Sequence, residues 1–481
     1  MRHRRWPFGI LTRLLAVCAL PLEFRAADWP KWRGPNGDGI SPEAGHLRTW
    51  AAAGPQVLWQ SEVHTGVSGL AVSGGRLYTV GNLANEDQVQ CLETATGRTV
   101  WIHRYPAPLG PDQYEGGPGA TPIVDGRQVF TLGKWGDLFC LDAATGRVIW
   151  GRRLATDFSL SLPEWGLSGS PLVLGDRLYL NAGGRGMALD KRNGTLVWSN
   201  IEGPNGYSAC IAYNHAGIPA VAFLGHREAV GVARSDGEVL LAMLWRTPFD
   251  RNFPDPIPFE DGLLICGAQL TAIYVGVEDR GSSIRWQAQA LQPSRSPGVI
   301  LNGHVYSFSG DPDVPGKFLC VKMEDGSVRW KHEGIVPGSV IGVGGRLLVL
   351  DGFGAVRIVA ADANAYRELS RAQILPQSRT WTPPSYANGV AYLRNSKGRL
   401  AAISLPLLPP STLGVRTINE SVEVTWTTVT TNAVLEQTQP NSSSGRPLWE
   451  AVPRTSGTWT TNSYRALPSA SAALYRLRIP E

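Results

Sequence analysis

Apolar and polar residues alternate over short runs along most of this 481-residue chain, and turns rich in glycine, aspartate and asparagine separate the runs. Such alternation is typical of half-buried β-strands, because successive side chains of a strand point to opposite faces of its sheet. No long amphipathic stretch with helical spacing interrupts the pattern. We therefore expect an all-β protein built from many short strands.

The strand runs recur as a unit that closes on a tryptophan. Its clearest copy runs from Gly119 to Trp150, and the next from Ser168 to Trp198. A repeat of 40 to 50 residues is the size of one four-stranded blade of a β-propeller. We expect these tryptophans to be structural, each docking an outer strand onto the neighbouring blade. They stand 41 to 49 residues apart, at Trp59, Trp101, Trp150, Trp198, Trp245, Trp286 and Trp330.

Eight such units can be counted, and they begin near Ser68, Ala120, Gly169, Ala209, Pro254, Ser296, Ser339 and Thr382. The fourth unit is irregular around Gly237, and the seventh has no tryptophan. The eighth stops after Leu405 without an outer strand, whereas residues 56–59 form a spare strand before the first unit. Pairing these two segments would close a ring and leave no open edge. The sequence thus predicts an eight-bladed propeller over residues 53–405.

The segments outside the repeats have different compositions. Arginines, a short apolar run and small residues make residues 1–27 typical of a secretory signal peptide, and the run is shorter than the ~20 residues of a membrane span. Arg4 and Arg5 leave a twin-arginine signal open, and Cys18 leaves a lipobox open. Residues 28–52 are then an N-terminal arm.

The C-terminal region is set off by three prolines within residues 406–411, which we interpret as a stiff linker. Residues 412–481 are rich in serine and threonine and contain short strand-like runs, with Trp426 in one and Tyr475 in another. We expect a small β-sandwich similar to a fibronectin type III module, with Trp426 in its core.

Charge and cysteine usage narrow the classes of partner. Removing the signal takes away five arginines and one glutamate, so the formal net charge falls from +5 to +1 and no basic stripe is left for nucleic acid. The five remaining cysteines include no Cys-x-x-Cys pair, and no two histidines have ligand spacing. We expect buried cysteines in strands, no metal site and no nucleic-acid partner.

The motif from Leu141-Asp142 to Trp150 resembles the docking motif of pyrroloquinoline quinone (PQQ)-type propellers. That family includes quinoprotein alcohol dehydrogenases and outer-membrane assembly lipoproteins, and the resemblance covers residues 28–405. The opening segment, residues 28–41, looks like the start of secreted PQQ-like propellers common in planctomycetes and verrucomicrobia. Three further segments also look like parts of these secreted propellers: Glu164–Gly166, Phe249–Asn252 and Trp381–Pro384. The resemblance implies a periplasmic or extracellular protein.

A quinoprotein dehydrogenase of this family would need PQQ, a Ca²⁺ ion held by oxygen ligands, a carboxylate base and flat residues around the quinone. Many members use a disulfide between adjacent cysteines as one face of that sandwich. This chain has no adjacent cysteines, no haem-attachment motif and no large insertion between its repeats. We therefore predict no catalytic residue and no cofactor, and keep PQQ with Ca²⁺ as the alternative.

Candidate ligand-binding residues lie in loops that precede first strands, near the central channel. Convergence from separate blades could form one pocket at the channel mouth. For Glu164 and Trp165 taken alone, the favoured interpretation is a rim ion pair with the tryptophan packed between blades. The candidates are Glu164, Trp165, Asn252, Asp255, Arg379 and Trp381.

The sequence favours a secreted or periplasmic scaffold that binds a protein or a polysaccharide through its loop face, without catalysis, as a monomer. One alternative is a PQQ- and Ca²⁺-dependent quinoprotein oxidoreductase. Another is an outer-membrane assembly scaffold that resembles the propeller lipoprotein of that machinery, which requires a lipidated Cys18.

Overall fold

The structure is a computed structural model that describes most of the chain. The described residues are 27–111, 114–278, 281–408, 412–418, 421–427, 434–438, 450–452, 458–459, 463–466 and 474–478. The predicted signal peptide lies outside them except for residue 27, as does Cys18.

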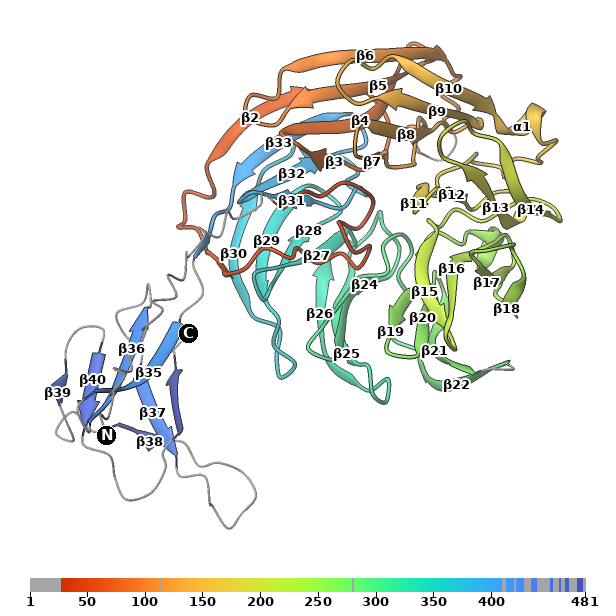
Figure 1. Cartoon of the computed structure of the whole chain (residues 1–481). Helices are drawn as coiled ribbons and strands as arrows, with labels where there is room; N and C mark the ends of the chain where they lie inside the picture. The colour runs from red at the N-terminus through yellow and green to blue at the C-terminus, as the bar shows by residue number, and fades with distance from the viewer. Residues whose placement is uncertain are drawn as a thin grey trace, which may run out of the picture.

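Residues 57–404 form eight four-stranded antiparallel sheets arranged as the blades of a ring (Figure 1). The first blade consists of β3 (Ala71–Ser73), β4 (Arg76–Leu83), β5 (Glu86–Glu93) and β6 (Thr99–Pro106), and the second of β7 (Ile123–Asp125), β8 (Gln128–Leu132), β9 (Asp137–Asp142) and β10 (Val148–Arg153). The third blade consists of β11 (Leu172–Leu174), β12 (Arg177–Leu180), β13 (Gly184–Asp190) and β14 (Leu196–Ile201), and the fourth of β15 (Ile211–His215), β16 (Ile218–Leu224), β17 (Glu228–Ala233) and β18 (Val239–Leu244). Blades five to eight consist of β19 (Ile257–Phe259), β20 (Gly262–Gly267), β21 (Leu270–Glu278) and β22 (Gly281–Ala288); β23 (Val299–Leu301), β24 (His304–Ser309), β25 (Gly316–Lys322) and β26 (Val328–Ile335); β27 (Ser339–Val343), β28 (Arg346–Leu350), β29 (Ala355–Ala360) and β30 (Glu368–Gln373); β31 (Ser385–Ala387), β32 (Val390–Arg394), β33 (Arg399–Ser404) and β2 (Val57–Glu62). The eight-bladed propeller predicted from the repeats is confirmed.

The two ends of the ring meet in the eighth blade. β2 pairs antiparallel with β33, with Trp59 opposite Ala402. The strand before the first unit thus supplies the outer strand of the last blade, as the repeat count predicted. Because β2 completes the four-stranded sheet of the last blade, the two ends of the propeller are joined and the ring closes without an unpaired edge.

Tryptophan docking joins consecutive blades through an indole hydrogen bond and, for five of the six docking tryptophans, through a contact with a glycine of the next blade. Trp101 of β6 donates its indole N–H to the carbonyl of Ala143 at 3.0 Å, and its ring lies against Gly146 of the second blade. A Cβ at Gly146 would come within 2.5 Å of that ring, and the glycine has φ +72°, so this position requires glycine. Six tryptophans make the indole-to-carbonyl bond at 2.7–3.4 Å: Trp59, Trp101, Trp150, Trp198, Trp286 and Trp330.

The prediction for Trp245 is wrong in its position. Leu241, not Trp245, pairs with the inner strand where the other blades have their tryptophan, because it stands opposite Gly231 after the same register shift. Trp245 lies just beyond the end of β18, is buried beside Gly267 of the next blade, and its indole N–H has no partner among the described residues. The longer interval after Gly237 carries the tryptophan past the docking position.

The seventh blade replaces its tryptophan with a segment of the N-terminal arm. Ser370 stands at the docking position of β30, and its hydroxyl both accepts from the N–H and donates to the carbonyl of Trp50. Trp50 packs against the hydrophobic core shared by the first, seventh and eighth blades.

The N-terminal arm crosses the middle of the ring (Figure 1, red). Trp29 bridges to Val72 of the first blade, and Ile40 bridges to Gly342 of the seventh. β1 (His46–Leu47) then pairs with β34 (Leu407–Leu408), which lies within the predicted linker. The arm is therefore tied to the first and seventh blades, which flank the eighth.

The remaining elements are small. The short helices are α1 (Leu154–Asp157) and η1 (Pro248–Asp250), and no helix of the described residues is long and apolar enough to cross a membrane. The five described cysteines are buried and free, as predicted.

After the propeller, strands form one four-stranded and one three-stranded sheet, consistent with a small β-sandwich. They are β35 (Thr412–Ile418), β36 (Ser421–Thr427), β40 (Ser463–Ala466) and β39 (Thr458–Trp459) in one sheet, and β38 (Glu450–Ala451), β37 (Val434–Thr438) and β41 (Leu474–Arg478) in the other. The side chains of Trp426 and Tyr475 lie outside the described part of the chain, so the predicted core role stays a prediction.

Candidate functional site at the channel mouth

A cavity of about 380 Å³ opens at one end of the central channel. Its wall is formed mainly by the loops that enter the first strands of the blades, and Trp32 of the N-terminal arm also lines it. In seven of the eight blades the residue four positions before the first strand reaches the cavity. These residues are Val67, Gly119, Ser168, Tyr207, Phe253, Arg295 and Trp381. One position of the repeat thus supplies a ring of different side chains around a single cavity.

Three of the six candidate residues, Trp165, Asp255 and Trp381, line this cavity. Asp255 links the N-terminal arm to the fourth blade at the cavity. Its carboxylate accepts hydrogen bonds from the Trp32 indole N–H at 2.6 Å and from the Ala209 N–H at 2.7 Å. Burial raises the pKa of Asp255, whereas the charge of Arg33 and the two hydrogen bonds lower it. Asp255 is therefore committed to holding the arm in place.

The other three candidates lie outside the cavity wall. Glu164 is exposed to solvent. Asn252 is fully buried, and its amide N–H groups donate to the carbonyls of Gly225, His226 and Trp245. Asn252 thus anchors the loop that carries other cavity residues rather than facing a ligand.

Arg379 lies behind Trp381. Its guanidinium forms two hydrogen bonds with the carboxylate of Asp313, at 2.9 and 3.2 Å, and lies 3.5 Å from Glu115. It also stands 5.5 Å from the centroid of the Trp381 ring. Arg379 therefore positions two residues that do line the cavity.

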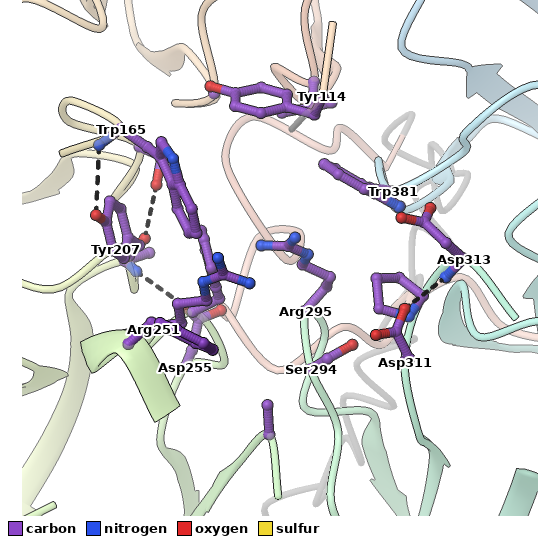
Figure 2. Close-up of a pocket in the computed structure, with 18 of the residues that line it drawn as sticks. Tyr114, Trp165, Tyr207, Arg251, Asp255, Ser294, Arg295, Asp311, Asp313 and Trp381 are labelled. Atoms are coloured by element: carbon purple, nitrogen blue, oxygen red, sulfur yellow. Dashed lines mark hydrogen bonds between the residues drawn. The ribbon is translucent and has the colours of Figure 1, made fainter. Parts of the chain in front are cut away.

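An aromatic cluster forms one side of the cavity. The rings of Tyr207 and Phe253 stack with centroids 4.6 Å apart and an interplanar angle of 20°. Trp165 lies nearly parallel to Phe253 at 5.8 Å, and its backbone N–H donates to the Tyr207 hydroxyl (Figure 2). Because three neighbouring blades supply these rings, the cluster is held by the rigid ring.

Two arginines face these rings. The Arg295 guanidinium lies between Phe253 and Trp381, at 4.1 and 4.3 Å from their centroids. The Arg251 guanidinium lies 4.3 Å from the centroid of Trp165. Figure 2 shows Arg295 extending into the middle of the cavity. Positively charged groups on aromatic faces therefore dominate this site.

Arg295, Tyr207 and Phe253 are not among the site residues predicted from the sequence, although a usable signal was present for all three. Each stands four residues before the first strand of its blade, the repeat position that Trp381 occupies in the eighth blade. Aligning the units on their first strands identifies all three. Tyr207 is missed when the units are aligned on their expected starts, because it stands two residues before Ala209.

Comparison with known proteins places the fold in a family. The family model described as outer membrane protein assembly factor BamB matches residues 43–117 and 86–332. The chain belongs to this family of PQQ-like propellers. A search of the curated proteins gave no match.

Solved structures show the same fold at low sequence identity. Quinohemoprotein alcohol dehydrogenase ADHIIG from Pseudomonas putida HK5 matches with a TM-score of 0.57 and 13% identity, covering 80% of this chain and 81% of that chain. Quinohemoprotein alcohol dehydrogenase from Comamonas testosteroni matches with a TM-score of 0.56 and 13% identity, covering 82% and 83%. A europium-containing methanol dehydrogenase matches with a TM-score of 0.56 and 12% identity, covering 78% and 89%. Identities this low show the propeller fold alone.

The donor set of the cavity does not fit the oxygen cage that Ca²⁺ takes. Among the described residues, no group of three or more His, Cys, Asp or Glu side chains could hold a metal ion. Asp255 is bound to the arm and Asp313 to Arg379. The guanidinium of Arg295 would repel a divalent cation in the middle of the cavity.

The aromatic faces are also poorly disposed to sandwich a quinone. Arg295 covers faces of Phe253 and Trp381, and Arg251 covers a face of Trp165. A flat cofactor would have to displace these guanidinium groups from the rings.

Proposed function

We propose that this propeller is a non-catalytic binding protein that takes part of a polysaccharide into the cavity at the channel mouth. The observation that carries the proposal is the cavity itself, whose volume of about 380 Å³ lies within the range of small-molecule sites. Its wall comes from loops of separate blades, and a rigid ring that presents variable loops is a common way to build a binding site.

The lining favours a saccharide over a flat protein surface. The cavity combines aromatic rings with uncharged polar side chains, Ser168, Gln269, Gln292 and Ser294. Hydroxyl and amide groups both donate and accept hydrogen bonds, as the hydroxyl groups of a sugar do. Protein partners bury larger and flatter areas than a cavity of this size supplies.

The proposal includes export from the cytoplasm. Residues 1–27 have the layout of a secretory signal, and the opening segment looks like that of the secreted propellers of planctomycetes and verrucomicrobia. The C-terminal strands would then form a fibronectin type III-like module, which could hold the propeller near its ligand.

Calorimetric titration of the mature protein with oligosaccharides tests this function. We expect saturable binding, and we expect Trp381→Ala to weaken it by roughly 10-fold or more, because stacking on an aromatic ring is lost. Phe353→Ala is a matched control, since Phe353 is partly exposed and does not line the cavity. Absence of binding to any neutral or acidic oligosaccharide would reject the function.

A quinoprotein oxidoreductase is the second candidate, favoured by the fold shared with the quinohemoprotein alcohol dehydrogenases. PQQ would supply the redox chemistry, but it could contact the rings of Trp165, Phe253 and Trp381 only if Arg251 and Arg295 moved away from them. Titration with PQQ, with and without Ca²⁺, separates the two candidates. Tight binding that requires Ca²⁺ would favour the oxidoreductase.

An envelope-assembly scaffold is the third candidate, favoured by the family to which the chain belongs. It requires a lipid anchor, and Cys18 is the residue that could carry one. The mass of the mature N-terminus distinguishes a diacylglyceryl cysteine at position 18 from a free terminus at residue 27 or 28.

A further inference from the structure

Arg295 can donate hydrogen bonds only in the plane of its guanidinium. Its central carbon lies over the rings of Phe253 and Trp381, 4.1 and 4.3 Å from their centroids. Within the described part of the chain, its Nε atom has no hydrogen-bond partner, although the atom is buried. A guanidinium that packs against two rings and has an unused in-plane donor is suited to an acceptor that approaches edge-on.

Nearby acids do not satisfy this arginine directly. Asp313 is held by Arg379, and Asp311 accepts a hydrogen bond from the Asp313 N–H. Burial and the neighbouring charge of Arg251 lower the pKa of Arg295 to about 10, although Asp313 and Asp311 act in the opposite direction. Arg295 remains charged at neutral pH in a poorly hydrated site, where an anion would stabilise it.

The rim of the cavity holds an exposed aromatic ring. Phe249 lines the cavity, is 79% exposed, and has φ +62°, a conformation that non-glycine residues rarely adopt. Arg227 fixes the next residue, Asp250, through two hydrogen bonds at 2.9 and 3.0 Å. Strained residues cluster at ligand sites, so an apolar ring held in water here is suited to packing on a sugar ring.

We propose that the cavity binds an acidic saccharide, with the carboxylate of a uronic acid residue in the plane of the Arg295 guanidinium and its ring near Phe249. This inference rests on the proposed function and names the ligand class of the same site. A carboxylate matches the in-plane donors of a guanidinium better than a neutral hydroxyl group does. The uncharged polar side chains on the wall would bind the remaining hydroxyl groups.

The test compares oligosaccharides from pectin and alginate with their carboxyl-reduced counterparts, by calorimetric titration of the mature protein. We expect the acidic forms to bind roughly 10- to 100-fold more tightly, because a hydrogen bond to a charged group is lost on reduction. We expect Arg295→Gln to abolish this difference between the acidic and the reduced forms.

Two variants control for fold and charge. Arg295→Lys keeps the charge but not the planar pair of donors, and we expect it to retain only part of the preference. Arg104→Gln removes a positive charge from an exposed outer strand, where Arg104 contacts Glu86 at 3.5 Å. We expect it to bind like the wild type. Matching thermal unfolding curves would show that all three variants fold.

Each other outcome overturns the inference. Equal binding of acidic and reduced forms would reject the carboxylate while leaving the proposed function intact. Binding of a sulfated dextran oligosaccharide but of no uronate would do the same. Binding of a pentaglutamate peptide with no saccharide binding would reject the inference and the proposed function together.

Discussion

Two positions of the repeat lie at opposite ends of each blade and vary to different degrees. The outer-strand position holds tryptophan in six blades, Leu241 in the fourth and Ser370 in the seventh. The position four residues before the first strand holds valine, glycine, serine, tyrosine, phenylalanine, arginine and tryptophan in the seven blades where it lines the cavity. Each docking tryptophan makes the same contact with its neighbour, so its identity is fixed by packing. The inner residues face one shared cavity, where difference between blades creates the site.

The comparison predicts that docking residues control stability and leave ligand binding unchanged, and the largest effect should come from Trp150. Trp150→Ala removes the ring that packs on Gly194 and the hydrogen bond to the Lys191 carbonyl. We expect the free energy of unfolding to fall by about 3–5 kcal/mol. Chemical denaturation measures this free energy. A loss below 1 kcal/mol would contradict the assignment of stability to the docking positions.

The glycine side of the same contact should matter nearly as much. Gly146→Ala would bring a Cβ within 2.5 Å of the Trp101 ring at a positive φ, and we expect a loss of about 2–4 kcal/mol. Gly126→Ala is the matched control, because Gly126 also has a positive φ but nothing lies within 4 Å of the new Cβ. A control loss of about 1–2 kcal/mol would isolate the clash. Equal losses for Gly146→Ala and Gly126→Ala would mean that the contact with the Trp101 ring contributes nothing to stability.

A buried carboxyl group in the first blade, that of Asp87, makes the stability of the propeller depend on pH. Asp87 is 1% exposed and accepts hydrogen bonds from Asn82 and Tyr105. Burial raises its pKa from 3.8 to about 6, although both hydrogen bonds lower it. A carboxyl with a raised pKa in the folded state stabilises the fold fully below about pH 4, and this contribution is lost as the pH rises through 6.

We therefore expect the stability of the wild type relative to Asp87→Asn to fall by about 1–3 kcal/mol between pH 4 and pH 7. Asparagine resembles the protonated acid and does not titrate, so the difference between the two unfolding curves isolates Asp87. Parallel curves across this range would show that the carboxyl titrates normally.

The smallest effect should come from the blade without a docking tryptophan. Ser370→Ala removes the two hydrogen bonds that its hydroxyl makes with the backbone of Trp50. We expect a loss of about 1 kcal/mol in thermal or chemical unfolding, far below that of Trp150→Ala. A loss as large as that of a docking tryptophan would mean that the arm is a full substitute for it.

The architecture could be predicted because its signals are local and repeated. The glycine-to-tryptophan interval marks the outer strand in each regular unit, and the spare strand at Trp59 requires a partner at the other end of the ring. The prediction failed for Trp245, because the longer interval after Gly237 moves the tryptophan beyond the docking register. The usual interval of four residues from Gly237 falls on Leu241, and the strand pairing shows that Leu241 takes the docking position.

The site could be predicted only in part, because its residues come from distant loops. Trp165, Asp255 and Trp381 lie in loops before first strands and do line the cavity. Asn252 lies in such a loop but turns inward to bind three carbonyl groups. Arg295 gains its character from rings that flank it in space and lie 42 and 86 residues away in the sequence.

The most direct test measures ligand affinity and unfolding free energy together for Arg295→Gln and Gly146→Ala, using uronate oligosaccharides. We expect Arg295→Gln to lose roughly 10-fold or more in affinity with its stability within about 0.5 kcal/mol of the wild type. We expect Gly146→Ala to lose stability and keep its affinity. An Arg295→Gln protein that binds like the wild type would contradict the assignment of the cavity as the binding site.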